Sequence, residues 1–435
     1  MEARRQARVG VRCVRVCRGP TRTHAVCTRK PCAAHKERHS MILTQCATCA
    51  APLPRLAKQC SRCQTRYCGP ACQKTHWEEG GHDKLCKKIK RGGGAEQYCA
   101  EKSYTKAVAI AAEACVEDTK GQTCYICTEA VHRHTKEGLV RGCACHTTEG
   151  FVHVSCLAEQ AKFLREEAEE NNLDGTARDA RRKRWYTCGL CKQQYHGVVS
   201  CAFGWACWKI YVDRPETDWA RQAAIGILGN GLSDAKYHEA ALTVREAELS
   251  MERRVGTSES NMLVLQSNLA STYQKLGRDQ QAQRMMRDVY SGRLKLNGEE
   301  HELTLIAATN YASSLIHLSD GRFKEARSLL RKTMPVARRV VGECDDITLK
   351  MRWNYANALY LGDGATLGDL REAVTTLETT TWIMQRDLGG AHPHVAGIER
   401  TLKAAQAALG AREASVPGDV RAICEAVAAM TPGDT

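Results

Sequence analysis

Hydrophobic and polar positions repeat with a long period in the second half of the chain. Three triplets, each an asparagine, a large residue and an alanine, follow one another at steps of 42 and 44 residues: Asn268-Leu269-Ala270, Asn310-Tyr311-Ala312 and Asn354-Tyr355-Ala356. Pairs of a polar residue and an alanine recur in the same phase at Glu239-Ala240, Gln281-Ala282, Glu325-Ala326 and Glu372-Ala373. A period of this size is typical of stacked supersecondary units. Each unit predicts two amphipathic helices, the first around the triplet and the second beginning at the polar-alanine pair.

These units resemble the long tetratricopeptide repeats of kinesin-light-chain type, over roughly residues 220–410. The segments Gly298-Glu299-Glu300-His301 and Gly390-Ala391-His392-Pro393 are similar to the inter-repeat loop of that family. The resemblance implies an all-α helical solenoid over residues 223–411, with degenerate terminal units that act as caps. Its concave groove would hold an extended peptide, or the array would serve only as a scaffold or a dimerisation surface. His301, His317 and His392 have no partner cysteines, and we interpret them as ordinary residues.

The first half of the chain is rich in cysteine, because most of the 24 cysteines lie there. One run has the ligand order C-x2-C, C-x-C, H-x2-C, C-x2-C. Eight ligands of this kind make two tetrahedral zinc sites, because a C-x2-C turn presents two thiolates to one ion and zinc accepts a neutral histidine nitrogen equally well. The eight predicted ligands are Cys124, Cys127, Cys143, Cys145, His153, Cys156, Cys188 and Cys191.

This order resembles the RING-CH (RING-variant) finger, with Cys143-Ala144-Cys145 and then His153 carrying the resemblance. The resemblance implies one ion on Cys124, Cys127, His153 and Cys156, and a second ion on Cys143, Cys145, Cys188 and Cys191. It also implies a finger that recruits a ubiquitin-conjugating enzyme through an apolar groove, in which Ile126 and Leu190 occupy matching places. Gln160 departs from the family, because many RING-CH fingers have a tryptophan at that position.

A second cluster of eight ligands begins just after Met41. The stretch Tyr67-Cys68-Gly69-Pro70-Ala71-Cys72-Gln73-Lys74-Thr75-His76-Trp77 closely resembles the MYND finger, which ends with the H-x3-C spacing that is also present here. Interleaved pairing would place one ion on Cys46, Cys49, Cys68 and Cys72, and the other on Cys60, Cys63, His82 and Cys86. His76 lies outside this order, so we expect it to pack or to cap. MYND fingers generally bind short, often proline-containing peptides of partner proteins.

The four zinc ions expected in the two fingers are structural. Fingers of this size bury too little apolar surface to fold alone, so the metal supplies the folding free energy. A catalytic zinc keeps one coordination position open to water or substrate, whereas both clusters offer complete sets of four ligands. We therefore expect no hydrolytic chemistry at these sites.

The formal net charge of +14 comes mainly from the start of the chain, because residues 1–40 hold eleven Lys or Arg against Glu2 and Glu37. This composition predicts a basic disordered arm or a transit-like leader, and Met41 leaves a later start open. Nucleic acid is not favoured as a partner, because stacking aromatic residues do not accompany the charge. No apolar run is long enough to span a membrane. Thiols at ligand spacing without a secretory signal indicate a reducing, intracellular compartment, the cytoplasm or the nucleus.

The expected fold class is multidomain, with two small cross-braced zinc fingers of irregular α+β structure followed by an all-α tetratricopeptide-type solenoid. We predict the following segments: a basic arm at 1–40, a MYND-like finger at 43–90, a linker with a short helix at 91–119, a RING-CH-like finger at 120–196, a linker at 197–222, the repeat array at 223–411 and a tail at 412–435. The gap at 157–187 predicts an acidic helix followed by a basic segment.

Three functions fit this organisation. In the first, the chain is a RING-type E3 ubiquitin-protein ligase that positions a loaded conjugating enzyme, while the repeats and the MYND finger bind partner proteins. In the second, it is a non-enzymatic adaptor for protein interactions. In the third, it is a PHD-like chromatin-associated factor, since the PHD finger has the same ligand order and Trp185 and Tyr186 precede the last ligand pair. Resemblance of fold alone does not decide between them.

Overall fold

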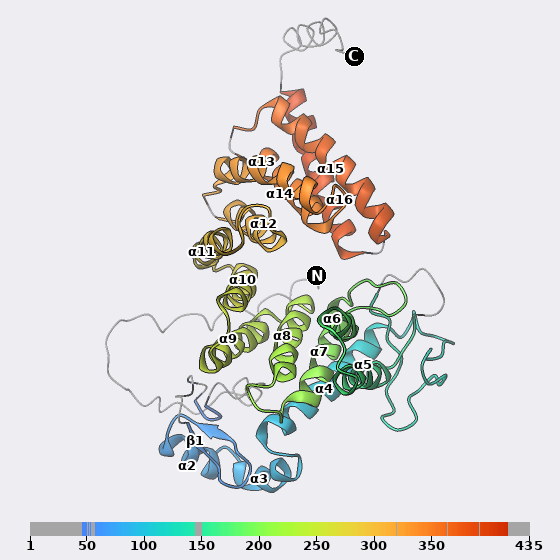
Figure 1. Ribbon diagram of the computed structural model, residues 1–435, viewed down its shortest axis with the longest axis vertical. Helices are drawn as coiled ribbons and strands as arrows, with labels where there is room; N and C mark the ends of the chain where they lie inside the picture. Colours follow the sequence, from blue (N-terminus) through green and yellow to red (C-terminus); the bar gives the residue numbers. More distant parts are fainter. Residues whose placement is uncertain are drawn as a thin grey trace, which may run out of the picture. The chain divides into compact units, whose positions relative to one another are not determined.

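The structure is a computed structural model of the chain (Figure 1). It describes residues 46–49, 51, 53, 57–143, 150–318, 320–362, 364–390 and 392–415. The basic arm expected at residues 1–40 lies outside the described residues, as do the predicted ligand Cys145 and the end of the expected tail. All of the described residues belong to one unit, Ser40–Thr435.

The first finger, residues 46–91, is a short hairpin followed by two helices. Strand β1 (Lys58–Gln59) pairs antiparallel with strand β2 (Arg66–Tyr67). Helix α2 (Pro70–Glu78) begins with a proline, which is favoured there because the first helical N–H has no intrahelical partner. Helix α3 (His82–Arg91) follows a glycine in the left-handed region. Four of the buried core residues of this finger are cysteines, so apolar packing alone does not hold it together.

The second finger, residues 124–196, is built around helix α5 (Val154–Glu170). Helix α6 (Gly175–Arg182) and the 3-10 turn η1 (Lys183–Trp185) follow, so the acidic helix and basic segment expected in this gap are both present. The finger contains only isolated bridges within its described residues, one between Val140 and Val152 and one between Thr187 and Gln194. It is therefore mostly irregular apart from its helices.

Both segments that we expect to be linkers are helical. Residues 91–119 contain helix α4 (Ala95–Ala114), which is longer than the predicted short helix because Ala100, Tyr104 and Ala111 bury one of its faces. Residues 197–222 contain helix α7 (Gly197–Tyr211) and the beginning of helix α8 (Trp219–Asp234). All residues from 201 to 208 are buried. A helix that is covered on all sides lacks the amphipathic period, so the hydrophobic pattern of this apolar run does not predict a helix.

Helices α7 and α8 pack closely because a glycine lies at each contact point. A Cβ at Gly204 would lie 2.9 Å from the Cα of Leu228, and a Cβ at Gly231 would lie 2.5 Å from the carbonyl oxygen of Ser200. These neighbours are backbone atoms, which cannot turn aside as a side chain can. One hydrophobic core therefore runs from α4 through the second finger and α7 into α8 and helix α9 (His238–Val255).

From α8 onward the chain is a succession of paired helices, drawn from green to red in Figure 1. After α8 and α9 come α10 (Glu259–Lys275), α11 (Asp279–Asn297), α12 (Glu302–Ile316), α13 (Phe323–Val340), α14 (Asp346–Tyr360), α15 (Leu367–Leu388) and α16 (Pro393–Ala414). The three predicted triplets lie in α10, α12 and α14, and their alanines are fully buried. The polar-alanine pairs lie near the beginnings of α9, α11, α13 and α15. The predicted all-α solenoid is confirmed.

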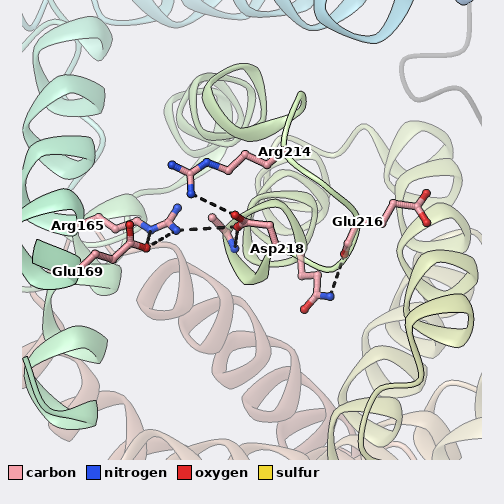
Figure 2. Close-up of polar contacts among 7 residues, drawn as sticks. Arg165, Glu169, Arg214, Glu216 and Asp218 are labelled. Carbon is pink, nitrogen blue, oxygen red and sulfur yellow. Dashed lines mark hydrogen bonds and ion pairs between the residues drawn. The ribbon is translucent and has the colours of Figure 1, made fainter. Parts of the chain in front are cut away.

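A polar network fixes the second finger to the first repeat (Figure 2). Asp218 caps the N-terminus of α8, since the N–H of Ala220 donates to its carboxylate over 2.7 Å. Arg214 pairs with the same carboxylate over 3.2 Å, and Arg165 of α5 approaches it to 4.0 Å. Burial raises the pKa of Asp218, but these hydrogen bonds and cations outweigh burial and hold that pKa below its usual range.

Throughout the described residues, every helix is too short or too polar to cross a membrane.

Candidate metal centres

Four groups of cysteine and histidine side chains lie close enough to hold one metal ion each. In each group, one donor atom of every residue lies within 4.8 Å of the others. The groups are Cys46, Cys49, Cys68 and Cys72; Cys60, Cys63, His82 and Cys86; Cys124, Cys127, His153 and Cys156; and Cys143, Cys188 and Cys191. They follow the interleaved pairing that the sequence indicates for each finger. Cys145, the expected fourth ligand of the last group, lies outside the described residues.

The spacing of the donor atoms fits zinc. Two thiolates on one tetrahedral zinc ion, with zinc–sulfur distances of about 2.3 Å, have their sulfurs about 3.8 Å apart. In the first finger the sulfur–sulfur distances are 3.6 Å for Cys49 and Cys68, 3.5 Å for Cys68 and Cys72, and 3.8 Å for Cys60 and Cys86. Thiolate and imidazole donors in this number and arrangement are those that structural zinc sites use.

The C-x2-C turns have a backbone geometry that directs both sulfurs to one point. In the turn that begins at Cys124, the N–H of Thr128 donates to the Cys124 carbonyl over 2.8 Å, and the φ of Thr128 is 62°. The N–H of Ile126 donates to the Cys124 sulfur over 3.4 Å. Burial raises the pKa of Cys124, but backbone hydrogen bonds from Cys127, His153 and Ile126 outweigh burial, so the pKa is lowered overall. The turn therefore favours the thiolate, which is the form that binds zinc.

In the second finger, the predicted histidine ligand lies at the beginning of α5. His153 Nδ1 lies 3.3 Å from the Cys127 sulfur and 3.7 Å from the Cys156 sulfur. The carboxylate of Glu137 accepts from the N–H of Ser155 over 3.0 Å and from the Tyr104 hydroxyl over 2.5 Å. Burial, together with this hydrogen bond, raises the pKa of Tyr104. The sequence does not connect helix α4 with the candidate metal site, but Tyr104 of α4 thus orients the turn that carries two of the predicted ligands.

A turn without cysteine has the same backbone geometry as the C-x2-C turns, and the sequence does not predict it. The N–H of Lys136 donates to the His132 carbonyl over 2.9 Å, and the φ of Lys136 is 59°. His132 and Thr135 occupy the places of the two cysteines, and the Thr135 hydroxyl lies 2.7 Å from His132 Nδ1, within hydrogen-bond distance. The His132 ring lies 5.3 Å from that of the ligand His153. The spacing of His132 and Thr135 equals that of a C-x2-C pair, which is the signal that could have revealed this turn.

His76 of the first finger packs as we expect. It is buried, and its Nδ1 lies 3.0 Å from the Tyr67 hydroxyl. Its ring lies 4.9 Å from that of His82, one of the candidate ligands. His76 therefore supports the ligand from outside the donor set.

The two apolar residues that we expect to bind a partner lie on the last and first turns of the second finger. Leu190 is 44% exposed and Ile126 is half-buried. The guanidinium of Arg184 donates to the Gln160 side chain over 2.6 Å, and a side chain at Gly189 would collide with this guanidinium. A polar pair thus occupies this part of the second finger.

Comparison with known families identifies two of the modules. The MYND finger matches residues 46–86, and the tetratricopeptide repeat matches residues 259–339. The chain combines a MYND zinc finger with a tetratricopeptide-like solenoid. Zinc therefore fits as its cofactor, and both modules are of kinds that contact other proteins.

Similar solved structures share low sequence identity with the chain. Two crystal structures of a kinesin light chain-type protein of Podosopora anserina, with nearly identical TPR-like repeats, are 16% identical and have TM-scores of 0.34 and 0.33. Each match covers 54% of this chain and 97% of the other. BtubC (BKLC) from P. vanneervenii is 14% identical, with a TM-score of 0.35, over 65% of this chain and 93% of the other. A comparison with curated proteins finds no match.

Proposed function

We propose that the second finger is a RING-CH-type finger, and that the chain is a ubiquitin ligase whose MYND finger and repeats bind partner proteins. The placement of two apolar side chains supports this proposal. Ile126 and Leu190 occupy the same place in two C-x2-C turns, and the N–H of each donates to the first cysteine sulfur of its turn over 3.4 Å. The resemblance to RING-CH fingers assigns the docking groove for a conjugating enzyme to these two turns.

Zinc has a structural part in this proposal. The sixteen predicted ligands would hold four ions, two in each finger, and the ions would fix the turns that carry Ile126 and Leu190. The three groups with four described donors leave no coordination position open for water or substrate. The ligase would act by holding a ubiquitin-loaded conjugating enzyme in a reactive geometry, which is catalysis by positioning.

A ubiquitin-discharge assay with the full chain and a panel of conjugating enzymes tests this proposal. The full chain is required because the second finger shares its core with α4, α7 and α8. The wild-type chain is expected to accelerate discharge from at least one enzyme, and Ile126→Ala is expected to lose this effect while it keeps its zinc. Val131→Ala is the matched control, because Val131 is an exposed apolar residue of the same finger. If the wild-type chain accelerates discharge from none of the enzymes, the ligase proposal is overturned.

A non-enzymatic adaptor is the second candidate, and one contact favours it. The hydrogen bond from Arg184 to Gln160 is a polar contact at a position where the resemblance to RING-CH fingers implies an apolar residue. Gln160→Trp would restore the apolar residue of the family and displace this contact. If discharge is absent in the wild-type chain and appears in Gln160→Trp, the finger has the RING-CH architecture but serves as an adaptor.

A further inference from the structure

A cavity of 1020 Å³ lies between the second finger and the first repeats. The end of the finger forms one wall, to which Trp185, Tyr186 and Gln194 contribute. The other walls come from α7, α8, α9 and α10, together with Ile306 of α12. The resemblance to tetratricopeptide repeats implies a groove made by the repeats alone. This cavity differs, because the second finger forms part of its wall.

The lining of this cavity is close to electrically neutral. Arg245, Glu248 and Glu252 are buried beneath its surface. Arg245 pairs with Glu248 over 2.7 Å, and burial raises the pKa of Glu252. The two remaining charged residues, Arg182 and Asp234, have opposite signs, and burial raises the pKa of Asp234 as well. Such a lining favours an uncharged ligand over nucleic acid or a highly charged peptide.

An amide side chain in this cavity is free to bind a peptide backbone. Asn310 of α12 donates to the hydroxyl of Ser267 over 3.2 Å and so ties its repeat to the preceding one. Asn268, at the same position of the preceding repeat, lines the cavity, and its side chain has no hydrogen-bond partner within the described part of the chain. An amide offers both a donor and an acceptor, as an extended backbone requires. Val264, one turn away and 40% exposed, offers an apolar contact beside it.

A smaller cavity of 410 Å³ adjoins the first and shares two lining residues with it. Its lining contains the guanidinium groups of Arg165, Arg178 and Arg182 and two carboxylates. Both carboxylates are already paired, Glu169 with Arg165 and Asp179 with Arg182. Arg178 has no ion-pair partner among the residues that the structure describes. The cavity therefore keeps a positive charge, and guanidinium groups bind carboxylates well.

Arg165 is held rigidly at this cavity. It is 5% exposed, and its guanidinium lies 4.6 Å from the ring centre of Tyr211 and 4.2 Å from that of Trp219. Its Nη1 is buried and has no hydrogen-bond partner among the described residues. Figure 2 shows Arg165 beside Glu169, with Asp218 on its other side. A buried donor without a partner is costly, and a bound anion close to this guanidinium would offset part of that cost.

We propose that the two cavities form one groove, which binds an extended peptide of uncharged, apolar residues that ends in or is flanked by a carboxylate. The carboxylate lies at α6, and the apolar segment runs along α8 and α10. The second finger supplies part of the wall, so binding requires a folded, zinc-loaded finger. This proposal concerns binding alone and stands whether or not the chain is a ligase.

The test begins with a displayed library of random peptides, selected on the full-length, zinc-loaded chain. Enriched peptides are expected to be apolar with a carboxylate at one end, and fluorescence anisotropy gives their dissociation constants. Amidated and free-acid forms of each peptide distinguish a terminal carboxylate from an acidic side chain. If no peptide is enriched, or if the enriched peptides are basic, the proposal is overturned.

Two matched pairs of variants locate the binding site. Val264→Arg puts a charge into the neutral groove and is expected to weaken binding by about tenfold or more. Val340→Arg is its control, because Val340 is 39% exposed on α13 and lines neither cavity. Arg178→Glu is expected to weaken binding similarly, whereas Arg181→Glu changes a neighbouring arginine that pairs with Glu167 and lines neither cavity. Equal effects within either pair contradict the proposal.

The contribution of the finger is tested separately. Gln194→Arg changes an exposed wall residue that is not a zinc ligand, and it is expected to weaken peptide binding at unchanged zinc content. Removal of zinc with a chelator is expected to abolish binding. If the peptides bind equally well before and after zinc removal, the groove belongs to the repeats alone and the composite groove is overturned.

Discussion

Replacement of Gly231 by alanine tests the core that the second finger shares with the solenoid. The added Cβ would lie 2.5 Å from the Ser200 carbonyl oxygen and 2.9 Å from the Cα of Cys201. Both are backbone atoms of α7, so the collision is relieved only if α7 and α8 move apart. Overpacking of this kind costs about 1–3 kcal/mol. Alanine is better than glycine inside a helix by about 1 kcal/mol, so we expect a net loss of stability of up to about 2 kcal/mol.

Gly410→Ala is the matched control for this experiment. Gly410 also lies inside a helix, α16, and an added Cβ would meet no atom within 4 Å. Only the helix propensity changes there, so we expect a gain of about 0.5–1 kcal/mol.

Thermal unfolding followed by circular dichroism measures both variants. A change of about 1 kcal/mol shifts the midpoint by about 2–4 °C for a domain of about 200 residues. We expect Gly231→Ala to lower the midpoint and to speed the release of zinc from the second finger to a chelator, whereas Gly410→Ala raises the midpoint. A higher midpoint in both variants would refute the close packing of α7 on α8.

Three further predictions concern a histidine, a hydrogen bond and a helix cap. Burial, with His394 and His196 nearby, lowers the pKa of His392 to about 4. The unfolded chain therefore binds more protons than the folded chain between about pH 6.5 and pH 4, so the free energy of unfolding falls as the pH falls through this window. His392→Asn keeps a capping side chain, and it should flatten the pH profile of the free energy of unfolding in urea. Tyr104→Phe removes the donor to Glu137 and should cost about 1 kcal/mol in the same urea assay; an unchanged midpoint would show that the contact does not stabilise the fold. Thr366→Ala removes the capping box of α15 and should cost about 1 kcal/mol in thermal unfolding, a result that equal melting of variant and wild type would exclude.

The features that the sequence predicts are those that repeat or that carry a metal-ligand spacing. The triplets at Asn268, Asn310 and Asn354 indicate the helix pairs, because the same packing environment returns in every repeat. The ligand order indicates that each finger holds two zinc ions, and the resemblance to known fingers implies which cysteines and histidines come together. Both signals are local or periodic, and the structure follows them.

The features that escape prediction depend on contacts between distant segments. The sequence predicts a linker where helix α7 lies, because a run that is buried on every side has no amphipathic period. Arg165 belongs to a segment of mixed charge, and only the approach of Tyr211 and Trp219 shows that it is buried. Glu137 gains its role from Tyr104, a residue of another helix. Local sequence patterns do not predict such contacts between residues that are far apart in the sequence.

The pairing of ligands in the second finger is the central claim, and native mass spectrometry of the full chain tests it most directly. We expect four zinc ions per chain, one for each group of donors. Replacement of Cys127 and Cys156 together by serine should remove one ion, because both belong to one group, whereas replacement of Cys127 and Cys188 together should remove two. A wild-type chain that holds only two ions, or a loss that is the same for both double variants, would contradict the cross-braced second finger.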